Sequence, residues 1–159
     1  MSRNEILLTY GYRILECDLF ADARMQKHHL RTDVASHSIN TALFCIAFYK
    51  ILSFFHIKLN IAMLVVAALA HDLGILGRSQ KFSSNFECLK VHPRDSVTVI
   101  QGIIPNIDSK ICDAIASHMF PLCPIVPNSK EAWLLSIADK CAACTDFFRH
   151  YGVPELAIA

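Results

Sequence analysis

A histidine and an aspartate stand side by side in one of the most apolar stretches of the chain. The stretch VVAALAHDLGI covers residues 65 to 75 and places His71 and Asp72 among small and branched apolar side chains. Burying an imidazole and a carboxylate in such a segment costs free energy unless both groups find strong partners. The pair therefore raises the question of which partner compensates for its burial.

Four further polar residues fall on the apolar faces of expected helices, and with His71 and Asp72 they make six potential metal ligands. They are His37, His92, His118 and Asp139. Imidazole and carboxylate donors of intermediate hardness suit Fe, Mn, Zn, Co or Ni. A single buried His or Asp is more often satisfied by a hydrogen bond in the core, but a helical bundle can bring several of them to one interior point. The combination therefore indicates a metal centre.

Helical patterns that must position these residues cover nearly the whole chain. Apolar spacing and capping residues predict helices over about residues 3–20, 33–55, 60–71, 94–104, 108–118 and 129–149. Residues 78–91 are polar and mixed, which predicts a surface connection, and Pro93 is expected in the first turn of its helix. The three prolines of FPLCPIVPNS predict an extended loop, and no strand pattern is visible. The expected fold is all-α, a compact bundle of about six helices.

Length, charge and hydropathy limit the remaining possibilities. The 159 residues suggest one domain, and a net charge of +1 without a Lys/Arg cluster argues against duplex nucleic acid as a partner. The longest uncharged apolar run, Leu59–Ala70, is shorter than the roughly 20 residues that cross a bilayer. The N-terminus lacks a secretory signal, and seven irregularly spaced cysteines suit a reducing compartment. We therefore expect a cytoplasmic protein without membrane partners, and a homodimer is compatible with the sequence.

The order of the six residues resembles the HD superfamily of metal-dependent phosphohydrolases, which is named after the adjacent His–Asp pair. The resemblance covers about residues 30–146. The stretches VHPRDSVTVI and IASHMFPLCPIVPNSKEAWLLSIADK are similar to small bacterial HD-domain proteins that have a second metal position. The resemblance implies a single HD domain over residues 1–159, with an N-terminal helix before the matched region and a short C-terminal tail after it.

The resemblance also implies a role for each ligand. One metal would be held by His37, His71, Asp72 and Asp139, and a second by His92 and His118, with Asp72 bridging the two. The expected cofactors are two divalent transition-metal ions from the group Fe, Mn, Ni, Co and Zn. A hydroxide shared by the two metals would attack a phosphomonoester or phosphodiester of a nucleotide or another small phosphate metabolite. The metal charge would then compensate for the burial of Asp72.

Several charged residues near the ligands are candidates for contact with substrate phosphate. Besides His71 and Asp72, we expect Lys140 and Arg94 in the catalytic machinery, because each lies close to a ligand in the sequence. Arg78 and Lys81 follow the HD pair in an expected loop, where we expect solvated surface charges more than phosphate contacts. His28 and His29 precede the second long helix, where a loop can cover the site.

Three functions from different classes remain open. The first is the dinuclear phosphohydrolase. The second is an HD-type mixed-valent diiron oxygenase, which uses the same six-ligand pattern. The third is a non-catalytic, metal-stabilised sensor or binding domain. The motif HDLGI has Ile75 where HD-type cyclic dinucleotide phosphodiesterases resemble HD-x-G-K, and no GYP triplet follows, so the phosphate contacts of that branch are not expected.

Overall fold

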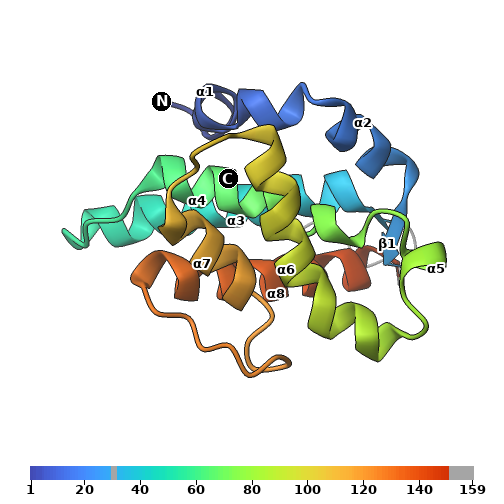
Figure 1. Ribbon diagram of the computed structural model, residues 1–159. Helices are drawn as coiled ribbons and strands as arrows, with labels where there is room; N and C mark the ends of the chain where they lie inside the picture. The colour runs from blue at the N-terminus through green and yellow to red at the C-terminus, as the bar shows by residue number, and fades with distance from the viewer. Residues whose placement is uncertain (30–31, 151–159) are drawn as a thin grey trace.

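The computed structural model describes residues 1–29 and 32–150 of the chain, and eight α-helices make up most of this part (Figure 1). The helices are α1 (Arg3–Leu15), α2 (Asp18–Met25), α3 (Val34–Phe54), α4 (Ile61–Ala70), α5 (Arg78–Lys81), α6 (Asn85–Ile103), α7 (Ser109–Ser117) and α8 (Lys130–His150), with a 3-10 turn η1 (Leu73–Ile75). Two short antiparallel strands, β1 (Lys27–His29) and β2 (Thr32–Asp33), join α2 to α3. The all-α expectation is confirmed, whereas the expectation of no strands was wrong at this pair. The expected C-terminal tail lies outside the described residues.

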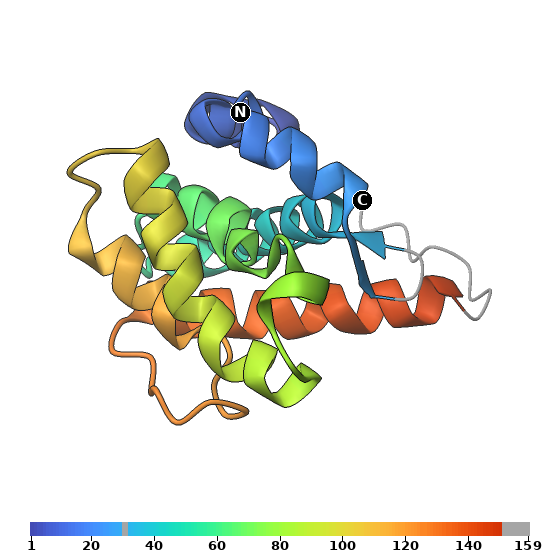
Figure 2. The same cartoon turned by 45° about the vertical axis from the view of Figure 1, so that its right-hand side comes forward.

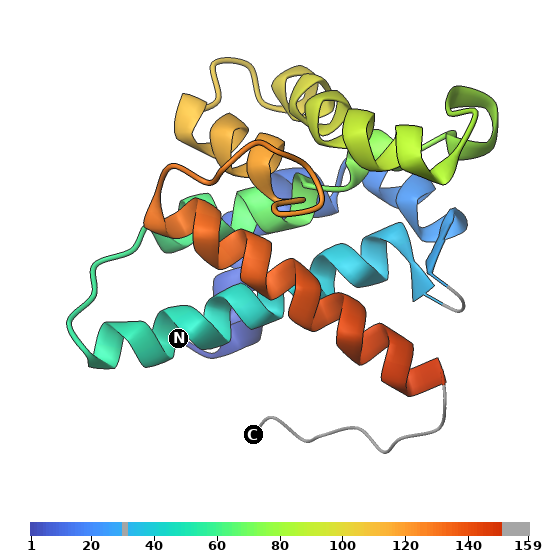
Figure 3. The same ribbon diagram turned by 90° about the horizontal axis from the view of Figure 1, so that it is seen from below.

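The long helices α3 and α4 form the centre of the bundle, and the other helices pack around them. α8 crosses α3 on one side, as the view from below shows (Figure 3). α1 packs against α4 and α3, while α6 packs against η1 and α7. The strands β1 and β2 lie between α2 and α8 (Figure 2). The ends of several elements therefore meet around the segment that connects α4 to η1.

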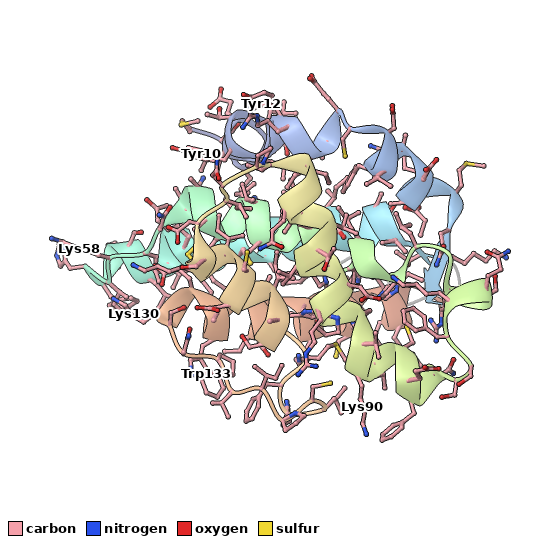
Figure 4. All side chains as sticks on the ribbon, viewed as in Figure 1. Tyr10, Tyr12, Lys58, Lys90, Lys130 and Trp133 are labelled. Carbon is pink, nitrogen blue, oxygen red and sulfur yellow. The ribbon has the colours of Figure 1, made fainter. Side chains whose placement is uncertain are left out.

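The core of the bundle is mostly apolar, and most charged side chains lie outside it. Fully or almost fully buried apolar residues come from every long helix, among them Ile14, Ile46, Leu69, Ile100, Ile115 and Leu135. Lys58, Lys90 and Lys130 lie at the periphery (Figure 4). None of the helices among the described residues is long and apolar enough to span a membrane.

Polar caps begin the helices where the sequence predicts them. Asp33, Asn60 and Asp108 accept hydrogen bonds from the backbone amides of Ser36 (2.7 Å), Met63 (3.1 Å) and Lys110 (2.9 Å). These bonds satisfy amides that have no partner within the helix, which is why the starts of α3, α4 and α7 were predictable. The single helix expected over residues 3–20 is wrong, because Cys17 is extended and a new helix, α2, follows it.

The helix that carries His92 begins earlier than the sequence suggested. α6 starts at Asn85, after the cap Ser84, whose side chain accepts from the amide of Glu87 at 3.1 Å. Pro93 consequently lies inside the helix and not in its first turn. Proline lacks the amide that would bond to the carbonyl of Leu89, four residues earlier. The thiol of Cys123 donates to that carbonyl at 3.0 Å, so the acceptor that Pro93 leaves open is satisfied.

Gly74 allows η1 to lie directly against α6. Its amide donates to Ser96 Oγ at 2.9 Å, and a Cβ atom at this position would overlap the His92 carbonyl oxygen and the Ser96 amide nitrogen. Both of these are backbone atoms of a helix, and they can move aside much less than the end of a flexible side chain can. The close approach therefore requires glycine.

We expect Gly74→Ala to destabilise the protein by about 3 kcal/mol, the upper part of the range for overpacked cores. Gly102→Ala is the matched control, because no atom lies within 4 Å of a Cβ built there. Gly102 lies in α6, where replacing glycine with alanine should increase the free energy of unfolding by about 0.5–1 kcal/mol. Urea unfolding of the metal-free variants checks both values, and equal midpoints for the two variants would contradict the close approach.

Candidate metal centre

The six residues expected as ligands converge at one place in the interior. They lie on α3 (His37), at the junction of α4 and η1 (His71, Asp72), on α6 (His92), at the end of α7 (His118) and on α8 (Asp139). All six are buried, and even the most exposed of them, Asp139, keeps only 8% of its surface accessible. Five elements thus supply six donors to a single buried cluster.

The two carboxylate oxygens of Asp72 divide the histidines into two groups. Asp72 Oδ2 lies 3.3 Å from His71 Nε2 and 3.7 Å from His37 Nε2. Asp139 Oδ1 completes this group, at 3.0 Å from His37 Nε2 and 3.5 Å from His71 Nε2. Asp72 Oδ1 faces the other way, towards His92 Nε2 at 3.2 Å and His118 Nε2 at 3.5 Å. Among the described residues, Asp72 is therefore the one carboxylate whose oxygens contact both groups.

Backbone carbonyls fix which nitrogen of each ring faces the cluster. The Nδ1 atoms of His71, His92 and His118 donate to the carbonyls of Ala68 (2.8 Å), Cys88 (2.7 Å) and Ile115 (2.6 Å). A carbonyl only accepts, so in a neutral ring Nδ1 carries the proton and Nε2 presents a lone pair. His92 Nε2 and His118 Nε2 lie 3.1 Å apart, and two lone pairs at this distance repel each other unless a cation or a proton lies close by.

His71 Nε2 adds a second observation that fits a metal ion. It is fully buried and has no hydrogen-bond partner among the described residues, although Asp72 and Asp139 lie near it. Ligating histidines commonly donate their other ring nitrogen to a carbonyl or a carboxylate, which is the arrangement found here. The donor set and its orientation therefore fit divalent metal ions.

Without a metal, protons stabilise the same arrangement. Burial alone would lower the pKa of each histidine, but the surrounding carboxylates reverse the effect. Hydrogen bonds to Asp139 and Asp146 raise the pKa of His37 to about 9. The nearby carboxylates of Asp72 and Asp139 raise the pKa of His71 to about 10, and a hydrogen bond with Asp72 raises that of His92 to about 9.

The pKa values of the other three groups of the cluster also follow from burial and from the charges around them. Burial and the positive charges of His71 and His92 lower the pKa of His118. Burial alone would raise the pKa of Asp72 and of Asp139, but the histidines around them hold both well below their usual range. Both carboxylates are therefore ionised at neutral pH and ready to bind a cation.

Asp146 belongs to the site although the sequence analysis missed it. Its Oδ2 accepts from His37 Nδ1 at 2.8 Å, and its Oδ1 accepts from Asn40 Nδ2 at 3.1 Å. It is buried on α8, seven residues after Asp139, and two helical turns place both residues on the same face. That spacing of two aspartates in an otherwise apolar stripe was the available signal.

His28 lies in β1 and also reaches the cluster. Its Nε2 is 3.1 Å from Asp72 Oδ2, and its ring packs against His37 with 4.6 Å between the centroids. The sequence suggested only that this region can cover the site, and the structure shows direct contact. The side chain of its neighbour His29 lies outside the described part of the structure.

Lys140 contacts the cluster through its protein neighbours. Its Nζ donates to the carbonyl of His118 at 2.6 Å, to Ser136 Oγ at 3.1 Å and to Asp139 Oδ2 at 3.4 Å. An ammonium group has three donors, and these three acceptors match them. The geometry favours a positioning role over the phosphate contact expected from the sequence.

We expect Lys140→Met to weaken metal binding by about tenfold, on the scale of groups that orient ligands. Lys90→Met is the control, since Lys90 is exposed and its Nζ lies over the Phe86 ring. The measurement is metal content per chain after dialysis at a fixed free-metal concentration. Wild-type metal content combined with a raised KM would instead support the phosphate-binding role.

The other candidate cations lie farther from the histidines. Arg94 is exposed on α6, and two residues correspond to 200° around a helix, so it lies on the opposite face from His92. Lys81 Nζ is 2.6 Å from Asp95 Oδ2 and donates to the Gly74 carbonyl at 3.0 Å. Arg78 donates to Asn85 Oδ1 at 2.7 Å and lines a cavity of about 650 Å³ together with Lys27. The structure therefore does not bring Arg94 to the cluster.

Comparisons with known proteins agree with the geometry. A family model described as HD domain matches residues 34–144, a range that holds all six expected ligands. No curated protein and no solved structure matches the chain.

Proposed function

Because the chain belongs to the HD-domain family, we propose that it is a phosphohydrolase with two metal positions that cleaves a phosphomonoester or phosphodiester. The substrate in this proposal is a nucleotide or another small phosphate metabolite. The HD domain points to the superfamily of metal-dependent phosphohydrolases, and the buried His/Asp groups of this chain can hold metal ions.

The observation that carries the proposal is the division of the histidines by Asp72. Each of its oxygens faces its own pair of imidazole Nε2 atoms, with His37 and His71 on one side and His92 and His118 on the other. A carboxylate in this position supports one ion on each side. When bound, two divalent ions would supply positive charge that lowers the pKa of a water molecule and neutralises phosphoryl oxygens.

The chain itself supplies orientation and a dry environment. The carbonyls of Ala68, Cys88 and Ile115 hold three rings by Nδ1, and Asp146 holds His37 in the same way. Such partners fix ring orientation and increase the basicity of the ligand. The groups are buried, so competing solvent is excluded from most of the cluster. These contacts place the ligands before a substrate arrives.

We place the part of the substrate beyond the reacting phosphorus in the cavity next to β1. Gln26 and Lys27 line it on one side, and Arg78, Phe82 and Ser83 line it on the other. Two cations against the one carboxylate of Asp22, together with hydroxyl groups and one aromatic ring, suit an anionic molecule with a planar or polar part. Gln26 also donates to the carbonyl of Ile75, three residues after Asp72, so this wall is tied to the segment that carries the HD pair.

An HD-type diiron oxygenase is the second candidate, and two observations favour it. Ile75 stands where the cyclic dinucleotide branch carries a lysine, and Lys140 directs its donors to protein acceptors. Both reduce the positive charge that a phosphate ester would find beside the metals. A non-catalytic domain stabilised by metal is the third candidate.

Metal analysis combined with a substrate panel tests the proposal. The protein is purified without chelators and without oxygen, and the metals are measured by elemental analysis. We expect two metal equivalents per chain, and phosphate release from a panel of nucleotides and small phosphate esters after loading with Mn²⁺, Co²⁺ or Ni²⁺. Oxygen consumption by an iron-loaded protein that releases no phosphate would favour the oxygenase. Bound metal without turnover in either assay would favour the non-catalytic domain.

A further inference from the structure

The strand β1 brings a fifth imidazole to the cluster. His28 Nε2 lies 3.1 Å from Asp72 Oδ2, closer than His71 Nε2 at 3.3 Å or His37 Nε2 at 3.7 Å. The His28 side chain is only 8% exposed although it comes from a short strand and not from a helix of the bundle. The contact with Asp72 is therefore part of the buried site.

The residues around His28 hold β1 against the HD segment. The Gln26 side chain donates to the Ile75 carbonyl at 2.9 Å and accepts from the Gly77 amide at 2.8 Å. The Gln26 carbonyl accepts from the amide of Val34 at 3.0 Å, which ties the same residue to the start of α3. Gln26 precedes β1 directly, so the strand begins at a fixed place relative to Asp72.

The atoms around His28 define one side of the cluster. The ligand atoms of His28, His37 and Asp72 all lie within 4.8 Å of one another, which is close enough for one ion to contact all three. We propose that His28 is a ligand of the metal position formed by His37, His71, Asp72 and Asp139. This position then has three imidazoles and two carboxylates, and the inference rests on the metal centre of the proposed function.

The two metal positions become unequal as a result. The position on the His28 side has five protein donors, whereas the other has His92, His118 and one oxygen of Asp72. Ions of the expected group bind four to six ligands, so protein groups nearly fill the first position and leave the second open. A substrate phosphate therefore binds first at the ion held by His92 and His118.

Cobalt titration tests this assignment without using turnover. Co²⁺ added to the metal-free protein should bind in two steps, each with its own visible absorption. His28→Phe keeps an aromatic ring against His37 but removes the nitrogen donor. We expect it to weaken one step by at least about tenfold, change that absorption and leave the other step unchanged. His56→Asn is the control, because His56 is exposed at a positive φ that asparagine tolerates.

A second variant keeps the test decisive if His28→Phe folds poorly. His28→Ala should show the same loss, and added imidazole should restore the wild-type absorption by filling the vacated place. Wild-type affinity and absorption in folded His28 variants would overturn the assignment. Absence of Co²⁺ binding by the wild-type protein would overturn it as well. Normal cobalt titrations without phosphate release would overturn the proposed hydrolysis and leave the His28 assignment standing.

Inorganic phosphate distinguishes the two positions in the same experiment. Phosphate added to the cobalt-loaded wild type should change the absorption of the step that His28→Phe leaves intact. A change confined to the step that depends on His28 would overturn the expected order of binding.

Discussion

Replacing Asp72 with alanine should remove both metal ions from the protein and lower turnover by about a thousandfold or more. Losses of this size follow when one member of an interdependent catalytic set is removed. The structural reason is that Asp72 contacts both groups of histidines, through a different oxygen on each side. Without it, each metal position loses its shared carboxylate. Elemental analysis and phosphate release measure the two effects on the same preparation.

Asp113→Ala is the control for the loss of a carboxylate, since Asp113 is exposed on α7 and its carboxylate accepts a long hydrogen bond from Asn128 Nδ2 at 3.4 Å. It should keep wild-type metal content and activity. An Asp72→Ala protein that retains one full equivalent of metal would show that Asp72 serves a single position. Retention of two equivalents would remove it from the ligand set.

The stabilisation that a divalent metal confers should increase steeply with pH. A histidine in the unfolded chain titrates near 6.5. In the metal-free fold the pKa values of His37, His71 and His92 are raised to about 9, 10 and 9, against the effect of burial, mainly by Asp139, Asp146 and Asp72. At pH values between the unfolded pKa near 6.5 and the folded pKa values of about 9 to 10, the folded protein binds more protons than the unfolded chain. The free energy of unfolding of the metal-free protein therefore falls as the pH rises through this window.

Metal binding has the opposite dependence, because ions bind neutral imidazole and must displace these protons. Each displaced proton makes the metal affinity about tenfold higher per pH unit, so displacement of one proton from each of three histidines allows an increase of up to about 1,000-fold per pH unit. Asp72 and Asp139, whose pKa values are lowered, stay ionised throughout this window and contribute no slope. The test compares melting temperatures with and without Zn²⁺ at about pH 6.5 and about pH 8.5. Equal increments at the two pH values would contradict the proton displacement.

The helices and most of the ligands could be predicted because their signals are local. Asp33 and Asn60 cap helices in the way their side chains allow in any context, and the adjacent His71 and Asp72 stand out against an apolar stretch. The convergence of the six expected ligands was an inference from bundle geometry, and the structure brings all six together.

The missed features depend on partners that are distant in the sequence. Nothing near Pro93 shows that Cys123, thirty residues later, supplies a donor to the Leu89 carbonyl, so a helix start was expected where the helix is already under way. The cap Ser84 lies within residues 78–91, whose polar and mixed composition predicted a surface connection. Asp146 acquires its contact with His37 only when α8 crosses α3, and Arg94 lies on the helix face opposite His92.

The spread of the ligands along the chain has a consequence for how the protein is made. His92 and His118 are 26 residues apart, whereas His37 is separated from Asp139 by 102 residues and from Asp146 by 109. During synthesis on the ribosome, the side of the cluster built from Asp72, His92 and His118 emerges well before α8. The other side stays incomplete until α8 has left the exit tunnel. The proposed metal loading of that side then has to wait for α8, and full loading would distinguish a chain that contains α8 from one that stops before it.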